Sequence, residues 1–467
     1  MGLVLNHQKC EVVGLASEDE ALWQASGLNF LVTSPAKACF LGAPLGDEGI
    51  LASLSANGQL IEELRPKLLR LTSHEAFYLL KSCFAVPRLQ YLLRCTPTFD
   101  SPALASLSRT IRDSLSSILN IQLEGDVWTQ ASLPVRWGGL GVRDIEALAA
   151  SSYLSSLHAS DPLVKLILPQ AGVLMAPPSS SHALESWRRL AAGSMPPSGE
   201  DAVKQRLWDD AVCRAIFDRL LAHADRPAQA RLLAVSSKDA GAWLHTLPLK
   251  ILGLCLTDNE IRVASGLRVG AAIVRPHTCA CGAAVEPLGL HGLSCKVRTA
   301  GRLRRHVLAN DVLVRAFRAA DVPAELEPHL LFRDDGKRPD GATLISWSEG
   351  IPLAWDFTCP DTMAPSHVAQ SASGAALVAA RAEQGKAAKY ASLISSNSLA
   401  FAPVAIETLG AWGPSATELC RKLGARLANV SQDPRAHFFL VQRLGLAVQR
   451  GNAASVAGTL PQVDMIT

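Results

Sequence analysis

The sequence predicts an α+β protein of several domains, with a mostly helical N-terminal half and a C-terminal half in which short strands and helices alternate. The chain has 467 residues, which allows about two to four domains of ordinary size. Apolar residues in the first half recur every three or four positions, as on one face of a helix. In the second half a cysteine cluster precedes short apolar runs that are separated by turns.

Composition limits the class of protein. Aromatic residues make up only 5% of the chain and hydrophobic residues 48%, so we expect cores built mainly from Leu, Val and Ala. The net charge of +3 is too small to imply a polyanionic partner by itself. No run approaches the roughly 18 apolar residues of a membrane span, and no charged-then-apolar leader begins the chain. The 11 cysteines, an odd number, favour a soluble protein from a reducing compartment with metal at the cluster.

Helical periodicity is clearest after residue 100, beyond a first segment of short apolar runs and turns. Ser101 is expected to cap a helix whose first residue is Pro102. Further helices are expected at residues 145–157, 201–221 and 260–267. The apolar face of the first helix consists of Leu104, Leu107, Ile111, Leu115 and Ile118.

Segments rich in glycine, proline or serine divide these helices. The glycine-rich segment 133–141 is expected to be a loop, and the Pro/Ser-rich segment 176–200 to be a linker. A helical region is then expected over residues 201–275. The small, polar segment 451–467 is expected to be a frayed tail.

A cysteine cluster at residues 276–298 has the spacing C-x-C-x(9)-H-x(3)-C, formed by Cys279, Cys281, His291 and Cys295. Thiolate and imidazole are the ligands that structural zinc takes in a tetrahedron, so we expect a zinc knuckle. The one-residue gap between the first two cysteines is shorter than usual, and His277 is close enough to replace one of them. The alternative is a glycine-rich loop with incidental cysteines.

A basic run follows the cysteines and contains no acid. Such a run is a signal for phosphate binding, and the alternative is an ordinary exposed helix face. His306 and Asn310 lie four residues apart on the same expected helix, and we interpret His306 as structural. The basic residues are Lys296, Arg298, Arg302, Arg304 and Arg305.

Two aspartates stand in contexts that favour a metal site. Asp340 follows Pro339, which suits the edge of a strand, and Asp356 lies inside the apolar run 353–358. A carboxylate in an apolar strand is costly unless it is paired or binds a metal. Two strands joined by a short turn can bring the two carboxylates side by side, where a divalent cation relieves their repulsion.

An alanine-rich helix is expected from about residue 365 to 396. A lysine that reaches a metal site can position the attacking water and stabilise charge on phosphorus. The alternative is an exposed helix with an ordinary Glu–Lys pair. Residues with suitable chemistry on one face of this helix are Glu383, Lys386, Lys389 and Tyr390.

Four motifs in this order resemble the PD-(D/E)xK restriction-like endonuclease of site-specific non-LTR retrotransposons, in which the nuclease follows a CCHC knuckle. The resemblance covers roughly residues 275–450 and implies a nuclease domain over 299–450, with a small mixed sheet flanked by helices. A further core strand is expected at 402–408. The motifs are Glu327-Pro328, Lys337 to Gly341 (KRPDG), Trp355 to Thr358 (WDFT) and Lys386 to Tyr390 (KAAKY).

The resemblance implies roles for individual residues. It makes Asp340 and Asp356 magnesium ligands, with Glu327 as the acidic residue that precedes the core motif. The usual lysine position holds Thr358, so the resemblance implies a helix lysine, Lys386 or Lys389. Arg338 joins the basic side chains that are expected to contact nucleic acid, and Ser415 with Glu418 is expected to form a capping box on the next helix.

The front of the chain resembles the reverse transcriptase of the same elements. Residues 1–80 resemble the end of the palm after the catalytic aspartates, and residues 81–175 resemble a thumb. The pairs Asp209-Asp210 and Asp334-Asp335 do not follow an apolar strand, so we expect no polymerase activity. The matching segments are residues 2–6, 9–11, 41–46 and 133–141.

These observations lead to three functional hypotheses. The first is a Mg²⁺-dependent DNA endonuclease with a structural zinc ion, expected in the nucleus because of its substrate. The second is an inactive transposon remnant that binds DNA or RNA through the knuckle and the basic helix. The third is a protein-interaction scaffold built on the helical front half.

Overall fold

The fold is mixed α and β, as the sequence predicts. The computed structural model describes residues 6, 10–14, 31–167, 178–297, 300–329, 331 and 338–461. Two compact units divide the chain: unit 1 comprises Met1–Lys67, Ser82–Ser114 and Asp144–Ala215, and unit 2 comprises the remainder. Two of their boundaries fall inside helices α5 (Pro102–Leu119) and α9 (Gln205–His223), and the division differs from that expected from the sequence. Segments 2–5, 7–9 and 332–337 and residue Arg298 lie outside the described residues.

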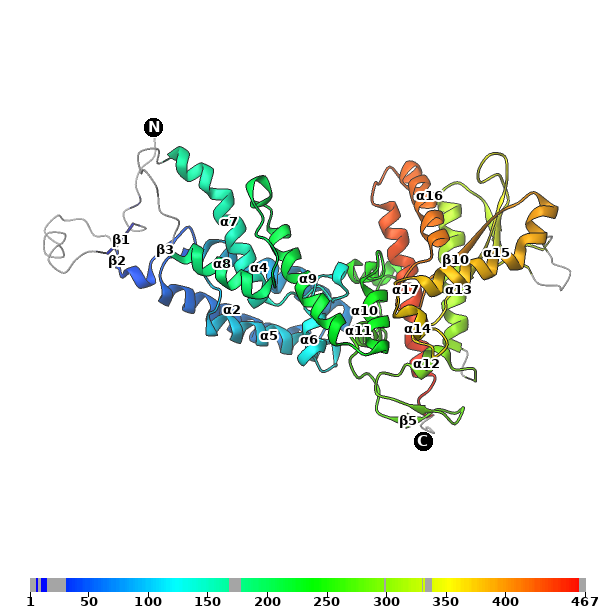
Figure 1. Cartoon of the computed structure of the whole chain (residues 1–467), viewed down its shortest axis with the longest axis horizontal. Coiled ribbons are helices and arrows are strands. Elements are labelled where there is room, and N and C mark those ends of the chain that lie inside the picture. Colours follow the sequence, from blue (N-terminus) through cyan, green and yellow to red (C-terminus); the bar gives the residue numbers. More distant parts are fainter. Residues whose placement is uncertain are drawn as a thin grey trace, which may run out of the picture. The chain divides into compact units, whose positions relative to one another are not determined.

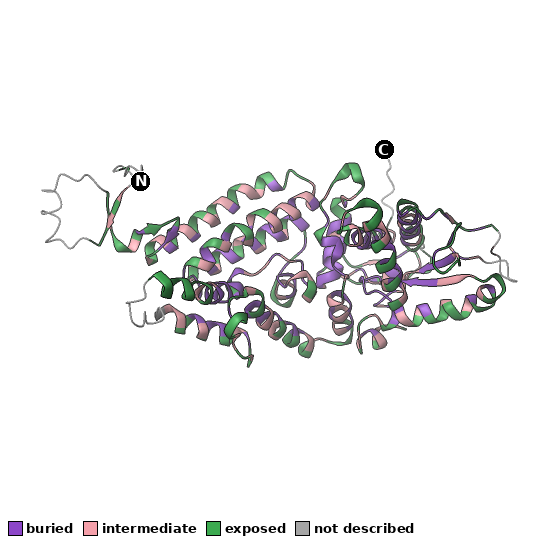
Figure 2. Cartoon of the chain, turned by 90° about the horizontal axis from the view of Figure 1, so that it is seen from above, coloured by how far each residue is buried: buried purple, intermediate pink, exposed green. Residues whose placement is uncertain are grey.

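Unit 1 is mainly helical, with four very short strands near its start (Figure 1). Its helices bury one face and expose the other, as the alternating colours of Figure 2 show. The helices predicted from Pro102, over 145–157 and over 201–221 are confirmed, although the last begins at Gln205. The elements are β1 (Glu11–Val13), β2 (Leu31–Thr33), β3 (Cys39–Phe40), β4 (Ala43–Pro44), α2 (Asp47–Leu68), α4 (Val86–Cys95), α5 (Pro102–Leu119), α7 (Ile145–Ile167), α8 (Pro178–Leu190) and α9 (Gln205–His223).

The expected linker at 176–200 is wrong over residues 178–190, because they form helix α8. The indole of Trp187 on this helix is fully buried and meets that of Trp208 edge to face at 5.0 Å. Its Nε1–H donates to the carbonyl of Trp208 at 3.0 Å. A run of Pro and Ser indicates a linker only when no large apolar side chain follows to anchor it.

The predicted loop at 133–141 is confirmed and belongs to unit 2, where the guanidinium of Arg268 holds it. Its Nε donates to the carbonyl of Gly139 at 3.0 Å and its Nη2 donates to that of Val135 at 2.8 Å. A Cβ on Gly139 would lie 2.0 Å from the Leu133 carbonyl, so only glycine fits there. Burial lowers the pKa of Arg268 to about 9.

The sheet of unit 2 has four strands in the order β10-β9-β8-β7. Strands β10 and β9 are parallel, whereas β9 pairs with β8 and β8 with β7 in antiparallel fashion. This is a small mixed sheet, and all residues of β9 except Thr358 are buried. The strands are β7 (Ala324–Leu326), β8 (Gly341–Thr343), β9 (Leu353–Thr358) and β10 (Ala400–Ala405).

Helices pack around this sheet and share one hydrophobic core with it (Figure 1). Trp355 of β9 stacks on Phe317 of α13, with ring centroids 4.9 Å apart. A Cβ on Gly341 would overlap the Trp355 ring, so glycine at this position lets the indole lie against β8. The remaining helices of unit 2 are α3 (Ser73–Leu79), α6 (Gly125–Ala131), α10 (Arg226–Ser236), α11 (Asp258–Val269), α12 (His291–Ser294), α13 (Ala300–Ala319), α14 (Val368–Ser371), α15 (Leu377–Asn397), α16 (Pro414–Ser431) and α17 (Ala436–Ala457).

The expected frayed tail at 451–467 is wrong for its first part, because α17 continues to Ala457 with buried residues on its inner side. Asn452 is fully buried and donates from Nδ2 to the carbonyl of Thr408 at 2.7 Å. A segment of small residues is typical of a frayed terminus. In this helix the small residues instead allow close packing, since Gly451 lies against Arg305 of α13. Among the described helices, none is both long and apolar enough to cross a membrane.

Candidate active site and metal centre

Of the two aspartates predicted to share a site, Asp340 directly precedes β8 and Asp356 lies in the antiparallel neighbour β9. Gly341 of β8 pairs with Trp355 of β9, so the next position of the ladder places Asp340 opposite Asp356. Directly opposed residues of an antiparallel pair project from the same side of the sheet. Two carboxylates 16 residues apart in the sequence are thereby brought side by side.

The carboxylate of Asp340 is oriented by hydrogen-bond donors from β9 and α13, among them Asn310. The backbone amide of Phe357 donates to its Oδ2 at 2.6 Å, and Nε2 of His306 lies 2.9 Å from the same oxygen. Burial alone would raise the pKa of Asp340, but the hydrogen bonds from His306 and Phe357 outweigh it and lower the pKa. Asp340 is therefore held as a carboxylate.

Asp356 is almost completely buried, at 2% relative exposure. The ammonium of Lys386 on α15 contacts its Oδ1. That oxygen accepts no hydrogen bond of good geometry from any residue the structure describes. Side chains alternate along a strand, so Trp355 packs on α13 while Asp356 meets the lysine of α15. Burial with one cationic neighbour leaves this carboxylate with capacity for a further ligand.

A cavity of about 450 Å³ opens beside this pair. Helix α13, the end of β9 and helix α15 contribute its walls. An anionic group that entered it would meet a cationic side chain from each helix, Arg302 from α13 and Lys386 from α15. The lining residues are Arg302, Leu303, Arg305, His306, Phe357, Thr358, Cys359 and Lys386.

Of the two candidate lysines, Lys386 reaches the acid pair and Lys389 has a different contact. The ammonium of Lys389 lies 4.7 Å from the ring centroid of Tyr390, and donates to its hydroxyl at 3.2 Å. The Tyr390 hydroxyl in turn donates to the carbonyl of Arg338 at 2.9 Å. Lys389 and Tyr390 therefore support the chain segment that leads into Asp340.

Glu327 contributes to the same segment through its backbone. Its amide donates to the carbonyl of Asp340 at 2.8 Å, while its largely exposed carboxylate pairs with the guanidinium of Arg338. The φ angle of Glu327 is +49°, an unusual value for a residue with a side chain. In this structure Glu327 and Arg338 bind each other.

Glu383, which shares the face of α15 with Lys386, caps a neighbouring helix. Its buried carboxylate accepts the backbone amides of Ser415 and Ala416, both at 2.9 Å, at the start of α16. It also accepts the amide of Ala405 at 3.3 Å. Burial raises the pKa of Glu383, although these amides act against that rise. The expected capping box of Ser415 and Glu418 is wrong, because α16 begins at Pro414 and a distant carboxylate caps it.

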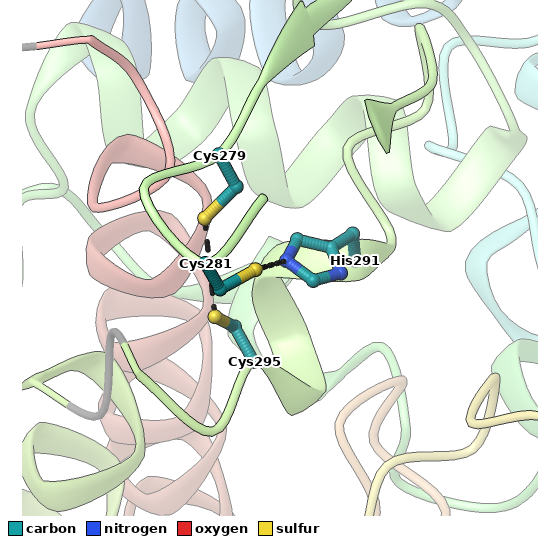
Figure 3. Close-up of side chains that lie close together, drawn as sticks. All are labelled: Cys279, Cys281, His291 and Cys295. Carbon is teal, nitrogen blue, oxygen red and sulfur yellow. Dashed lines mark hydrogen bonds between the residues drawn. The ribbon is translucent and has the colours of Figure 1, made fainter. Parts of the chain in front are cut away.

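The cysteine cluster has the geometry of a metal centre (Figure 3). Its four ligand atoms all lie within 4.8 Å of one another. Sulfurs of Cys279 and Cys295 are 3.9 Å apart, and Sγ of Cys281 is 3.2 Å from Nε2 of His291. Zinc–sulfur bonds of about 2.3 Å give tetrahedral edges of about 3.8 Å. The Cys₃His set could therefore bind a metal such as zinc.

The ligands come from a hairpin and a short helix. Strands β5 (His277–Thr278) and β6 (Ala284–Val285) are antiparallel, and a turn with Gly282 at φ +85° joins them. That turn carries Cys279 and Cys281, while α12 (His291–Ser294) supplies His291 and is directly followed by Cys295. His277 is not a substitute ligand, since its Nδ1 contacts the Arg275 carbonyl at 2.8 Å and its Nε2 the Thr459 hydroxyl at 3.1 Å.

The basic run does not form a single exposed face. Arg305 is only 2% exposed, and its guanidinium donates to Asn452, Ser455 and the Leu293 carbonyl at 2.9–3.1 Å. The expectation that Arg305 contacts nucleic acid is therefore corrected: it joins α13 to α17 and to α12 of the cysteine module. The exposed basic residues of this run are Lys296, Arg302 and Arg304, of which Arg304 lies 3.4 Å from Glu260.

The sequence interpretation missed the contact between His306 and Asp340. Spacing on α13 placed His306 and Asn310 on one face, but sequence alone did not show which strand that face meets. The sequence feature that could have indicated this contact is the polar pair His306 and Asn310, four residues apart on the helix that precedes the motif of Asp340.

No protein-family model matches this chain, and no curated protein is similar enough to place it in a family. The chemistry of the site must therefore be argued from its own residues.

Replacing Glu383 tests its assignment as a cap. Glu383→Ala leaves three backbone amides without their acceptor, so we expect unfolding to become easier by about 2 to 4 kcal/mol. The exposed neighbour Gln384 gives the control Gln384→Ala, which should leave stability nearly unchanged. Chemical denaturation measures both, and equal stabilities of the two variants would contradict the capping role.

Metal content tests the cysteine cluster. The purified chain should hold one zinc ion, and Cys281→Ser should weaken zinc binding by more than the roughly 10-fold that loss of an outer contact costs. Atomic absorption and competition with a chelator measure this, with the exposed Cys83→Ser as control. A chain that binds no zinc, or binds it equally after Cys281→Ser, would refute the site.

Proposed function

We propose that this protein is a Mg²⁺-dependent DNA endonuclease that hydrolyses phosphodiester bonds. The observation that supports it best is the pair Asp340 and Asp356, opposed across two strands with the ammonium of Lys386 on one of them. Two carboxylates and a lysine around one point are the groups that metal-assisted phosphodiester hydrolysis requires. The choice of DNA as substrate depends on the resemblance to PD-(D/E)xK nucleases.

The acid pair fits a hard divalent cation. Magnesium prefers oxygen ligands and is usually bound by one or two carboxylates together with phosphate and water. Oδ1 of Asp356 is buried and contacts the ammonium of Lys386, so a cation bound by Asp356 would lie beside this lysine. Magnesium bound there would supply positive charge that activates a water molecule and neutralises charge on the scissile phosphate.

The residues around the pair have separate tasks in this proposal. Asp340 and Asp356 hold the cation, and the hydrogen bonds on Asp340 keep it ionised. Lys386 lines the cavity and can stabilise the extra negative charge on the phosphate. Arg302, exposed on the opposite wall, can bind a phosphate oxygen through charge-assisted hydrogen bonds. DNA would then approach along the cavity between α13 and α15.

The origin that we propose is a site-specific non-LTR retrotransposon polyprotein. Support comes from the order of features along unit 2: cysteine cluster, basic helix, acid pair, and a lysine on the following long helix. A nuclear location would follow from a chromosomal DNA substrate. We also propose that this chain has no polymerase activity, because neither of its Asp-Asp pairs follows an apolar strand.

A zinc-dependent nucleic-acid-binding module is a second candidate function. The Cys₃His cluster supports it, together with the exposed cations Lys296, Arg302 and Arg304 close by in the sequence. Such a module binds through phosphate contacts, so its affinity falls steeply with salt but does not need the acid pair. DNA or RNA binding without Mg²⁺-dependent cleavage would favour this function over the first.

Plasmid nicking separates the two functions. With Mg²⁺, the full chain should nick supercoiled DNA, and Asp340→Ala with Asp356→Ala should lower the rate at least about 100-fold through loss of the cation site. The matched control replaces two aspartates outside the cavity, Asp311→Ala with Asp433→Ala. Equal nicking by the wild type and the acid-pair variant would remove the endonuclease assignment.

A further inference from the structure

His306 contacts the carboxylate of Asp340, and its position differs from that of a histidine that only packs in a core. It lies on α13, is 42% exposed at its side chain, and its Nε2 is 2.9 Å from Oδ2 of Asp340. It also lines the cavity between α13 and α15. A histidine that served only the core would be buried, whereas this one faces the space where a substrate would enter.

The ring of His306 is held from two sides. The aromatic ring of Phe357 meets it edge to face, with centroids 6.3 Å apart. The side-chain nitrogen of Asn310, one turn further along α13, lies 3.4 Å from Nε2 and 3.5 Å from Nδ1. Asn310 is itself fixed, because its Oδ1 accepts the indole N–H of Trp355 at 3.0 Å.

Two of the donors to Asp340 reach the same oxygen. The Phe357 amide and His306 Nε2 converge on Oδ2, so they fix the plane of the carboxylate. A cation shared with Asp356 would then bind a carboxylate whose orientation is already fixed. A ligand oxygen that is oriented in advance loses less entropy when the cation binds.

We propose that His306 is a positioning residue that orients the Asp340 carboxylate for a divalent cation shared with Asp356. The inference depends on the proposed function only for its effect on cleavage, since cation binding can be measured without catalysis. Outer contacts of this kind typically change metal affinity or activity by about 10 to 100-fold. His306 touches neither the cation nor the phosphate in this assignment, so it is not a catalytic residue.

The experiment compares two side-chain amides that differ by one methylene. His306→Gln places a donor near the position of Nε2, whereas His306→Asn carries the same amide on a shorter side chain that falls short of Asp340. His306→Leu removes the donor altogether. His223→Leu, on the exposed histidine of α9, is the control.

Two readouts are measured on the full zinc-loaded chain. Calorimetric titration with Ca²⁺ gives cation affinity without cleavage, and plasmid nicking with Mg²⁺ gives the rate. We expect Ca²⁺ affinity and nicking to fall about 10 to 100-fold in His306→Asn and His306→Leu. His306→Gln should recover most of both, and the thermal midpoint without Ca²⁺ should stay near that of the wild type in all three variants.

The outcomes separate this inference from the proposed function. Wild-type Ca²⁺ affinity in His306→Asn and His306→Leu overturns the positioning role, even if nicking is lost. No Ca²⁺ binding by the wild type, or binding that survives Asp340→Ala, overturns it as well. If the wild type never nicks DNA but Ca²⁺ affinity follows the donor at residue 306, the positioning role stands and the endonuclease proposal fails.

Discussion

The sheet of unit 2 contains a buried carboxylate, that of Asp356, close to a second carboxylate, that of Asp340, and the packing around the sheet depends on how both are stabilised. Asp356 is inside the strand β9, and Asp340 directly precedes the neighbouring strand β8, so two carboxylates of like charge lie close together. Three groups offset this repulsion: the ammonium of Lys386, the imidazole of His306 and the Phe357 amide. They come from α15, α13 and β9, so the acid pair also ties two helices to the sheet.

Side chains on different faces of helix α13 have different functions. Arg305 points inward and joins the cysteine module to α17, whereas His306, the next residue, reaches Asp340. Arg302, one turn earlier, lines the cavity. Successive residues on a helix are about 100° apart, so three basic side chains within five positions can serve the core, the site and the entrance. The basic run is therefore a poor guide to an exposed cationic surface.

Much of the local structure could be predicted from the sequence, and most of the long-range contacts could not. The helix from Pro102 was predictable because its cap and apolar face are local signals, and the Cys₃His cluster because its ligands lie within 17 residues. Glu383 was misread because the helix that it caps begins about 30 residues later. Helix α8 was misread because prolines and serines precede its buried Trp187. Each error arose where a distant part of the chain supplies the partner.

Stability alone does not explain why an acid pair occupies the centre of this sheet. Taking a carboxylate out of water costs several kcal/mol, and replacing a buried ion pair by apolar side chains of similar size is often neutral or stabilising. Phe357 and Trp355 on the other side of β9 show that apolar residues pack well in this strand. Glu383 and Arg305, in contrast, satisfy several backbone or side-chain groups each and so contribute to folding. Among the described residues, Asp356 has one ion pair, with Lys386, and orders no backbone group, which favours a ligand as the reason for its presence.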